Sequence, residues 1–209
     1  MTATRVVHVI DDDEAVRDSL AFMLGTARME VQTYDSALAF LSALPGLNSG
    51  CIVTDVRMPH MSGVDLLLKL AELKVPLPVI VMTGHGDVQL AVEAMKIGAA
   101  DFIEKPFDDE VLLAAIQSAL DRWESKVEQA AERGAYLEKI ATLSGRERDV
   151  LEGLVAGKPN KIIAFDLGIS ARTVEIYRAN VMTKMGANSL SELVRMAVVA
   201  GILASRAKT

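Results

Sequence analysis

The chain has 209 residues, enough for one large or two small domains. Residues 1–124 carry 9 basic and 19 acidic side chains, residues 125–142 carry three of each, and residues 143–209 carry 10 basic and 6 acidic. This favours an acidic domain followed by a basic, nucleic-acid-binding one, over a single domain with a basic patch. One cysteine excludes an intramolecular disulfide and a cysteine-rich zinc site. Without a signal peptide or a long apolar run, we expect a cytoplasmic protein with no membrane association.

The first half alternates short β-rich runs with longer amphipathic stretches. This pattern predicts an α/β doubly wound, five-stranded parallel sheet with helices on both faces. Strands are expected near 5–10, 30–34, 50–55, 78–82 and 101–104, and helices near 14–28, 36–43, 63–73, 87–97 and from 108 onward. Helix N-caps are expected at Asp35–Ser36, Asp87 and Asp108.

Polar residues stand where several of these strands end. Asp11 and Asp12 follow the first strand, Asp55 closes the third, Thr83 follows the fourth and Lys105 follows the fifth. Ligands of such sheets bind beyond the carboxyl ends of the strands, so we expect these residues to converge there. Three acids could hold a hard cation, while the hydroxyl and the ammonium suit phosphate oxygens. The arrangement predicts a phosphoryl-accepting aspartate.

The order and spacing of these residues resemble the receiver domain of bacterial response regulators, over about residues 5–122. The matching segments are Asp55–Pro59 with Gly63 behind it, Thr83–Gly84 and Lys105–Pro106. The resemblance implies a flavodoxin-like fold in which a sensor histidine kinase phosphorylates Asp55.

Mg²⁺ (or Mn²⁺) is the implied cofactor of this site. Its expected ligands are Asp12, the Asp55 carboxylate and the backbone carbonyl of Arg57, with Asp11 joining through water. Lys105 and Thr83 would each contact a phosphoryl oxygen. The neighbouring Asp13 is expected to cap a helix rather than to bind metal.

A switch is also implied by the receiver resemblance. On phosphorylation Thr83 would move toward the phosphate and Phe102 would turn inward, although Phe102 could instead be an ordinary core side chain. The face formed by the 87–97 helix and the 101–104 strand would then support a homodimer, with Val92 and Lys96 as candidate contacts.

The last helix of this half is expected to continue as a connector, from about 108 to 141. Apolar residues recur there at alternating steps of three and four, as a coiled-coil-like seam requires. A flexible linker after about 124 is the alternative. We therefore expect a domain at 1–124, a helical linker at 125–142 and a second domain at 143–209.

Four short helices are expected after the connector. Ser144–Glu147 and Ser189–Glu192 read as capping boxes, and Asp166–Ser170 as a tight turn between two helices. Two helices joined by a short glycine-containing turn, within a basic segment, suggest a small all-α helix-turn-helix domain.

The helix after this turn has two different faces. Val174, Tyr177, Val181 and Met185 fall at helical spacing and should be buried. The opposite face could meet base edges in a DNA major groove, while basic side chains meet phosphates. The expected base-facing residues are Thr173, Glu175, Ile176 and Ala179, and the expected phosphate contacts are Lys161, Arg172, Arg178 and Lys184.

This segment resembles the C-terminal domain of the LuxR/FixJ class of transcription factors. Matching residues include Arg146–Arg148, Pro159–Lys161, Thr173–Val174 and Asn180–Met182, with Tyr177 standing where many relatives have histidine. The resemblance implies that the helix after the turn reads double-stranded promoter DNA and that the fourth helix helps dimerise.

The two halves together resemble FixJ-type two-component response regulators. That implies phosphorylation by a FixL-like, haem-containing sensor histidine kinase, and activation of nitrogen-fixation or microaerobic genes through RNA polymerase. A paralogue that serves another kinase is the alternative. An aspartyl-phosphate phosphatase of the haloacid-dehalogenase type would need a second aspartate where Arg57 stands. We therefore expect a phosphoacceptor regulator, with at most autophosphorylation and autodephosphorylation, rather than an enzyme.

Overall fold

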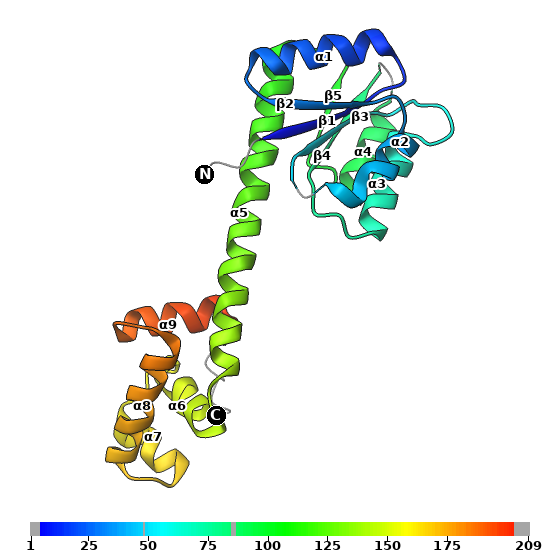
Figure 1. Ribbon diagram of the computed structural model, residues 1–209. Coiled ribbons are helices and arrows are strands. Elements are labelled where there is room, and N and C mark those ends of the chain that lie inside the picture. The colour runs from blue at the N-terminus through cyan, green and yellow to red at the C-terminus, as the bar shows by residue number, and fades with distance from the viewer. Residues whose placement is uncertain (1–4, 48, 85–86, 203–209) are drawn as a thin grey trace. The chain divides into compact units, whose positions relative to one another are not determined.

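The computed structural model describes residues 5–47, 49–84 and 87–202, and it divides into two compact units between Ser125 and Lys126 (Figure 1). The first unit is the predicted five-stranded parallel sheet, in the order β2-β1-β3-β4-β5. Its strands are β1 Val6–Ile10, β2 Glu30–Tyr34, β3 Cys51–Asp55, β4 Val79–Thr83 and β5 Asp101–Glu104. Its helices are α1 Glu14–Thr26, α2 Ala37–Ala43, the short 3₁₀ turn Leu44–Gly46, α3 Gly63–Glu72, α4 Val88–Ile97 and the first part of α5 Asp109–Ala141.

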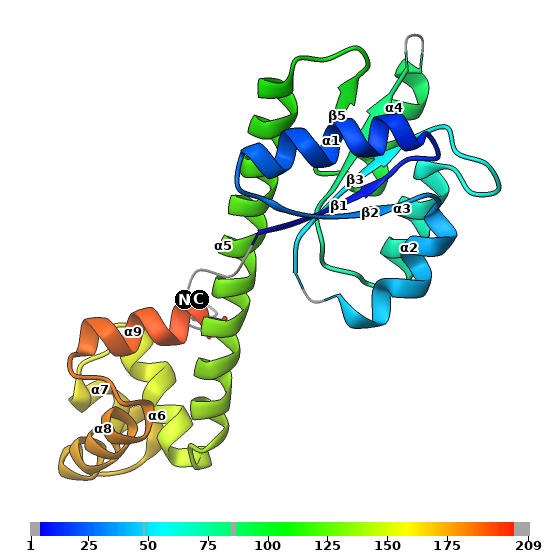
Figure 2. The same ribbon diagram turned by 45° about the horizontal axis from the view of Figure 1, so that its top comes forward.

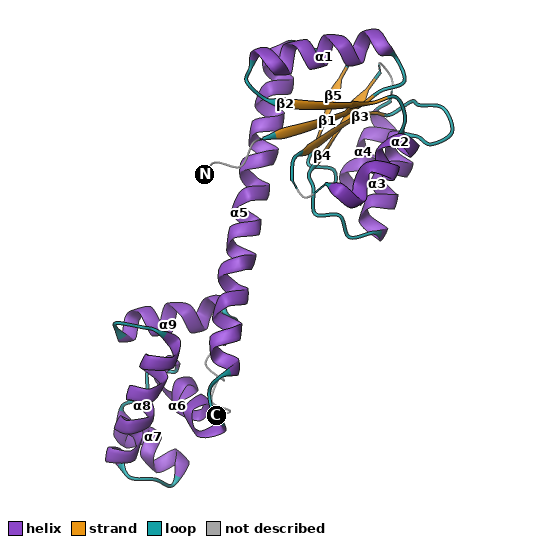
Figure 3. Ribbon diagram, in the orientation of Figure 1, coloured by secondary structure: helices purple, strands orange, loops and turns teal. Residues whose placement is uncertain are grey.

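Helices cover both faces of the sheet (Figure 3). Successive side chains of a strand point to opposite faces, so each strand supplies two apolar layers. Val9 and Val53 pack with α1 and α5, whereas Ile10 and Ile52 pack with α2, α3 and α4. Burial on both faces explains why the inner strands β1, β3 and β4 are mostly apolar, whereas the outer strands β2 and β5 carry exposed polar residues.

Helix caps follow the sequence expectation in part. Asp13 caps α1 by accepting a hydrogen bond from the Ala15 backbone N–H, and Ser36 caps α2. Asp87 stands at the N-cap of α4 but makes no side-chain capping bond, so that expectation is wrong for its carboxylate. The carboxylate is bound by Arg57 instead.

Helix α5 runs without a break from Asp109 to Ala141, over the stretch where the connecting helix is expected. Its early turns bury Leu112 and Ile116 in the core of the first unit. Its last turns give Ile140 and the half-buried Tyr136 to the core of the second unit. One helix therefore supplies core residues to both units.

The second unit joins the last turns of α5 to α6 Gly145–Val155, α7 Asn160–Leu167, α8 Ala171–Met185 and α9 Leu190–Val199 (Figure 2). Gly153 lets α6 and α7 touch, because a Cβ there would lie 2.8 Å from Cγ1 of Ile163. Ser144 and Glu147 form the predicted capping box. The second predicted box is incomplete: Ser189 caps α9, but Glu192 accepts from the Asn188 backbone N–H.

Candidate phosphoacceptor site and DNA-binding surface

The carboxyl ends of the parallel strands bring four of the expected site residues to one edge of the sheet. Asp11 directly follows β1, Asp55 ends β3, Thr83 ends β4 and Lys105 follows β5. β1 and β3 are neighbours, so the two aspartates lie side by side at this edge. Strand order thus converts sequence separations of up to 94 residues into direct contacts.

Lys105 bridges the two aspartates. Its Nζ lies 2.6 Å from Oδ1 of Asp55 and 2.9 Å from Oδ2 of Asp11. The Asp11 side chain is only 3% exposed and that of Asp55 14%. Burial alone would lower the pKa of Lys105, but hydrogen bonds to the two carboxylates outweigh burial and raise it. The ammonium therefore stays charged and offsets the repulsion between the acids.

The second carboxylate oxygen of Asp55 is also held. The backbone N–H of Arg57 donates to Oδ2 of Asp55 across 2.6 Å. Gly63 allows α3 to begin against this loop, because a Cβ there would lie only 2.2 Å from the Asp55 carbonyl oxygen. Asp55 is thereby fixed in orientation at the open edge of the sheet.

The donors around Asp55 suit a hard cation in chemistry. Carboxylate oxygens and a backbone carbonyl are the ligands that Mg²⁺ takes in proteins. Within the described residues, however, no three acidic, histidine or cysteine side chains are gathered closely enough to form a ready-made metal cluster. Asp11 and Asp55 are brought together through Lys105, while Asp12 is exposed and forms no hydrogen bond with either.

The two residues expected to form a switch differ in burial. Thr83 is 3% exposed, and its carbonyl accepts a hydrogen bond from the Lys105 backbone N–H across 2.7 Å. Phe102 is 44% exposed, so the alternative of an ordinary core aromatic is wrong. It lines a surface hollow with Phe107 and Val111. On α4, Val92 is 48% exposed and Lys96 is also exposed.

An ion pair absent from the sequence expectations joins two loops at this edge. Arg57 donates from Nε to Oδ2 of Asp87 across 3.0 Å, and from Nη2 to Oδ1 across 2.5 Å. The Arg57 side chain is 73% exposed, whereas that of Asp87 is 5% exposed. The hydrogen bonds from Arg57 lower the pKa of Asp87, which therefore stays ionised.

Helix α8 has the two faces that its sequence predicts. Val174, Val181 and Met185 are fully buried, and Tyr177 is only partly so. On the other side Ile176 is 56% exposed. Most of the residues on α8 that we expect to contact DNA are exposed: Arg172, Glu175, Ile176, Ala179 and Lys184. Thr173 and Arg178 are partly buried.

A hollow of about 570 Å³ lies between α8 and the start of α7. Lys161, Glu175 and Arg178 line it together, so the structure gathers three residues that were assigned to DNA separately. Lys158, which the sequence did not single out, also lines this hollow. Its position just before Asn160 places another cation at the start of α7.

Lys184 already has a partner within its own unit. Its Nζ lies 2.7 Å from Oε2 of the buried Glu147 and 3.4 Å from the Thr142 carbonyl oxygen. The hydrogen bond from Lys184 is the main reason that the pKa of Glu147 falls to about 2, and the Ser144 backbone N–H adds to it. A phosphate contact by Lys184, as expected from sequence, would have to compete with this carboxylate.

Comparison with known proteins finds a matching family for each of the two units. The model of the response regulator receiver domain matches residues 7–117, and that of bacterial regulatory proteins of the luxR family matches residues 141–197. Among the helices that are described, none combines the length and apolar character needed to cross a membrane.

Close relatives match almost the entire length. The chain is 60% identical to the transcriptional regulatory protein FixJ of Azorhizobium caulinodans over 94% of this chain and 93% of the relative. It is 55% identical to FixJ of Bradyrhizobium diazoefficiens over 97% of this chain and 99% of the relative. The crystal structure of full-length FixJ from B. japonicum covers 97% of this chain and 100% of its own, with a TM-score of 0.63 and 55% identity. The chain therefore belongs to the FixJ-type two-component response regulators, transcription regulators in which a receiver domain precedes a LuxR-type DNA-binding domain.

Proposed function

We propose that Asp55 is the phosphoacceptor of this regulator. The observation that carries the proposal is the Lys105 ammonium, which lies within hydrogen-bonding distance of both Asp55 and Asp11 at the strand ends. An Asp55 oxygen attacks the phosphorus of a phosphohistidine on a sensor kinase. The phosphorus–nitrogen bond breaks and an acyl phosphate forms. Lys105 then pairs with a phosphoryl oxygen, and Thr83 donates a hydrogen bond to another.

Receiver domains generally use Mg²⁺ for this transfer, and Mn²⁺ is the alternative here. We assign its ligands to Asp12, the Asp55 carboxylate and the Arg57 carbonyl, with Asp11 acting through water. When bound, the ion neutralises charge on the transferring phosphoryl group. Lys105 is charged beforehand, so the chain itself supplies one of the needed cations.

Phosphorylation would be read out through Thr83 and Phe102. Phe102 is exposed in this structure, so an inward turn would remove an aromatic side chain from the β5 surface. The altered α4–β5 face, with Val92 and Lys96, would then support a homodimer. The chain would do no chemistry beyond gaining and losing its own phosphoryl group.

The second unit would bind double-stranded promoter DNA through α8 and the start of α7. We assign direct readout to Thr173, Glu175, Ile176 and Ala179, and phosphate contact to Lys161, Arg172 and Arg178, with Lys184 only when released from Glu147. The bound dimer would recruit RNA polymerase in the cytoplasm. Similarity to proteins named FixJ supports a FixL-like kinase and microaerobic or nitrogen-fixation genes. A different sensor kinase is the alternative.

Phosphorylation can be tested with acetyl phosphate, Mg²⁺ and intact-mass measurement. The wild-type chain should gain one phosphoryl group and shift toward dimer in sedimentation, whereas Asp55→Asn should do neither. Asp101→Asn is the control, because Asp101 begins β5 and so lies at the amino ends of the strands, away from Asp55. Normal phosphoryl gain in Asp55→Asn would disprove the assignment.

The sensor partner needs a separate experiment. Phosphotransfer from a purified haem-containing kinase should be faster without oxygen than with it if the pathway is an oxygen-sensing one. Phosphotransfer that is absent from this kinase, but efficient from acetyl phosphate, would favour the paralogue alternative.

A further inference from the structure

Helix α5 carries an apolar stripe that continues beyond the first unit. Steps of three and four residues place on it Val127, Ala130, Gly134, Leu137 and Ala141. We call these five residues the α5 seam. Val127 and Leu137 are each 45% exposed, and neither is among the described residues that build a hydrophobic core. The two large side chains of the seam are therefore available to a partner.

A different face of the same turns contacts the second unit. Tyr136 and Ile140 pack into its core, and Glu132 pairs with Arg195 of α9 across 2.8 Å. At 3.6 residues per turn, the three α5 residues centre on a face about 140° around the helix axis from the seam. The second unit thus uses one side of α5, and the seam lies on the other.

The order of residues in the seam favours a second parallel helix. The steps assign Val127, Gly134 and Ala141 to the a positions of a heptad, and Ala130 and Leu137 to the d positions. A β-branched residue at a together with leucine at d favours a two-stranded parallel coiled coil. Gly134 has no side chain to hold a partner helix away.

Charges beside the seam complement a second copy of the same helix. In a parallel pair, a residue at g faces the residue at e that lies five positions later in the other chain. Arg133 occupies g and Glu138 occupies e, and both are exposed. Neither forms an ion pair within the described part of the chain. Two copies related by a twofold axis would form this pair twice.

The neighbouring g and e positions do not oppose the pairing. Lys126 occupies the preceding g position and faces Ala131, so only one member of that pair is charged. The flanks of the seam therefore bring opposite charges together at one level and no like charges at the other. This self-complementarity identifies the partner as a second copy of the chain.

We propose that the α5 seam pairs in parallel with the same seam of a second copy when phosphorylation brings two receivers together. This inference rests on the proposed homodimer, and it adds a contact surface beyond the α4–β5 face. A seam of about two heptads is too short to pair by itself. Two chains joined through their receivers hold their seams at a high effective concentration, which allows the seams to close.

The first test places single cysteines on α5 of the full chain. Cys51 can stay, because it is buried and burial raises the pKa of its thiol to about 12. Identical a or d positions face each other in a parallel pair. With acetyl phosphate, Mg²⁺ and mild copper–phenanthroline oxidation, Val127→Cys and Leu137→Cys should therefore form disulfide-linked dimers. Ala135→Cys, exposed on the same helix but off the seam, is the matched control and should cross-link weakly.

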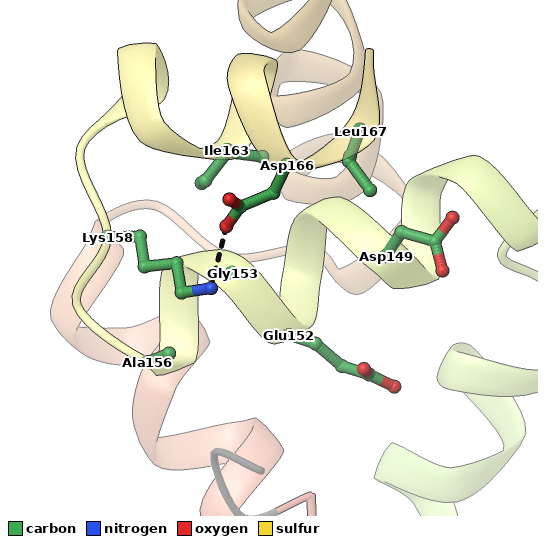
Figure 4. A pocket seen from close by; sticks show the side chains of 8 residues that line it. All are labelled: Asp149, Glu152, Gly153, Ala156, Lys158, Ile163, Asp166 and Leu167. Carbon is green, nitrogen blue, oxygen red and sulfur yellow. Dashed lines mark hydrogen bonds and ion pairs between the residues drawn. The ribbon is translucent and has the colours of Figure 1, made fainter. Parts of the chain in front are cut away.

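The second test reverses charges and measures dimerisation of the phosphorylated chain by sedimentation. Glu138→Arg should weaken dimerisation about fivefold, the scale of two exposed ion pairs. Arg133→Glu/Glu138→Arg should restore it. Residues five apart do not face each other within one helix, so restoration reports pairing between chains. Asp166→Arg is the control, because it reverses the charge of a residue that pairs with Lys158 at 2.7 Å on the surface of the second unit (Figure 4).

The outcomes separate the seam from the proposed homodimer. If phosphorylated wild type stays monomeric in sedimentation, both proposals fail. If Val127→Cys and Leu137→Cys dimerise in sedimentation but cross-link no more than Ala135→Cys, the seam proposal alone is overturned and the homodimer stands. Equal cross-linking without acetyl phosphate would overturn the dependence on phosphorylation. A double charge variant that dimerises as weakly as Glu138→Arg would overturn the pairing of Arg133 with Glu138.

Discussion

The guanidinium of Arg57 and the carboxylate of Asp87 form a two-point ion pair between the loop after β3 and the start of α4. Arg57 thus has two roles in one residue. Its backbone N–H orients Asp55, and its side chain holds the segment that follows β4. Because two nitrogens pair with two oxygens, the contact fixes the direction of both side chains as well as their distance.

We predict that Arg57→Lys loosens the first turn of α4. An ammonium cannot reproduce the two-point geometry of a guanidinium, and the buried Asp87 carboxylate would lose a hydrogen bond. Hydrogen exchange of the backbone amides at 89–93 should become faster. Lys69→Ala, which removes the exposed Lys69–Glu72 pair, is the control and should leave these amides unchanged. Equal exchange in Arg57→Lys and wild type would show that the pair does not restrain α4.

Gly63 and Gly25 should respond in opposite ways to alanine. A Cβ at Gly63 would meet the Asp55 carbonyl oxygen at 2.2 Å, so Gly63→Ala should destabilise the receiver by about 3 kcal/mol or more. No atom lies within 4 Å of a Cβ at Gly25, a residue inside α1, so Gly25→Ala should stabilise by about 0.5–1 kcal/mol. Urea unfolding followed by the fluorescence of Trp123 measures both. A stable Gly63→Ala would mean that α3 can shift away from β3.

The ion pair between Glu147 and Lys184 should make the second unit sensitive to acid. The pKa of Glu147 lies at about 2 in the folded protein against an ordinary value of 4.5. Its stabilising contribution is therefore complete above about pH 4.5 and is lost as the pH falls toward 2. Thermal unfolding of residues 126–209, followed by circular dichroism, should show this decline. In Glu147→Gln the decline between pH 4.5 and 2 should be shallower, and a decline as steep as wild type would exclude Glu147 as its source.

Cationic and base-facing residues of the DNA surface should differ in their effects. Lys161→Ala and Arg172→Ala should weaken binding to all sequences, and each should reduce the slope of log affinity against log salt by about one unit. Glu175→Ala should change the preferred sequence in a binding-site selection, because a carboxylate accepts only from a base that offers a donor. An unchanged selected motif would remove Glu175 from direct readout.

The inner strands and the polar residues at their ends could be predicted from the sequence. A strand that is buried on both faces appears as a short, continuous apolar run. Val79–Thr83 is continuously buried, and such a run bounded by loops has few alternatives. The proximity of Asp55 and Lys105 then follows, because all strands of a parallel sheet have their carboxyl ends on the same side.

Contacts between distant loops left no such pattern. Asp87 looks like an ordinary N-cap, and only the approach of Arg57, 30 residues away, shows that its carboxylate is used elsewhere. Lys184 similarly looks like a free cation on α8 until the fold places the buried Glu147 beside it. The sequence also did not determine whether Phe102 is buried or exposed, because an aromatic residue in a strand fits either a core or a surface position.

Helix α5 also determines where this protein can be cut or recombined. Side chains at 125–131 are all exposed, whereas the turns before and after them supply core residues to one unit or the other. A helical segment as short as 125–131 has little stability by itself in water. These turns therefore depend on the buried turns before and after them to stay helical. A chimaera joined inside this stretch keeps both hydrophobic cores whole. A junction at 142–143, which the sequence alone would suggest, removes Tyr136, Ile140 and the Glu132–Arg195 ion pair from the DNA-binding module.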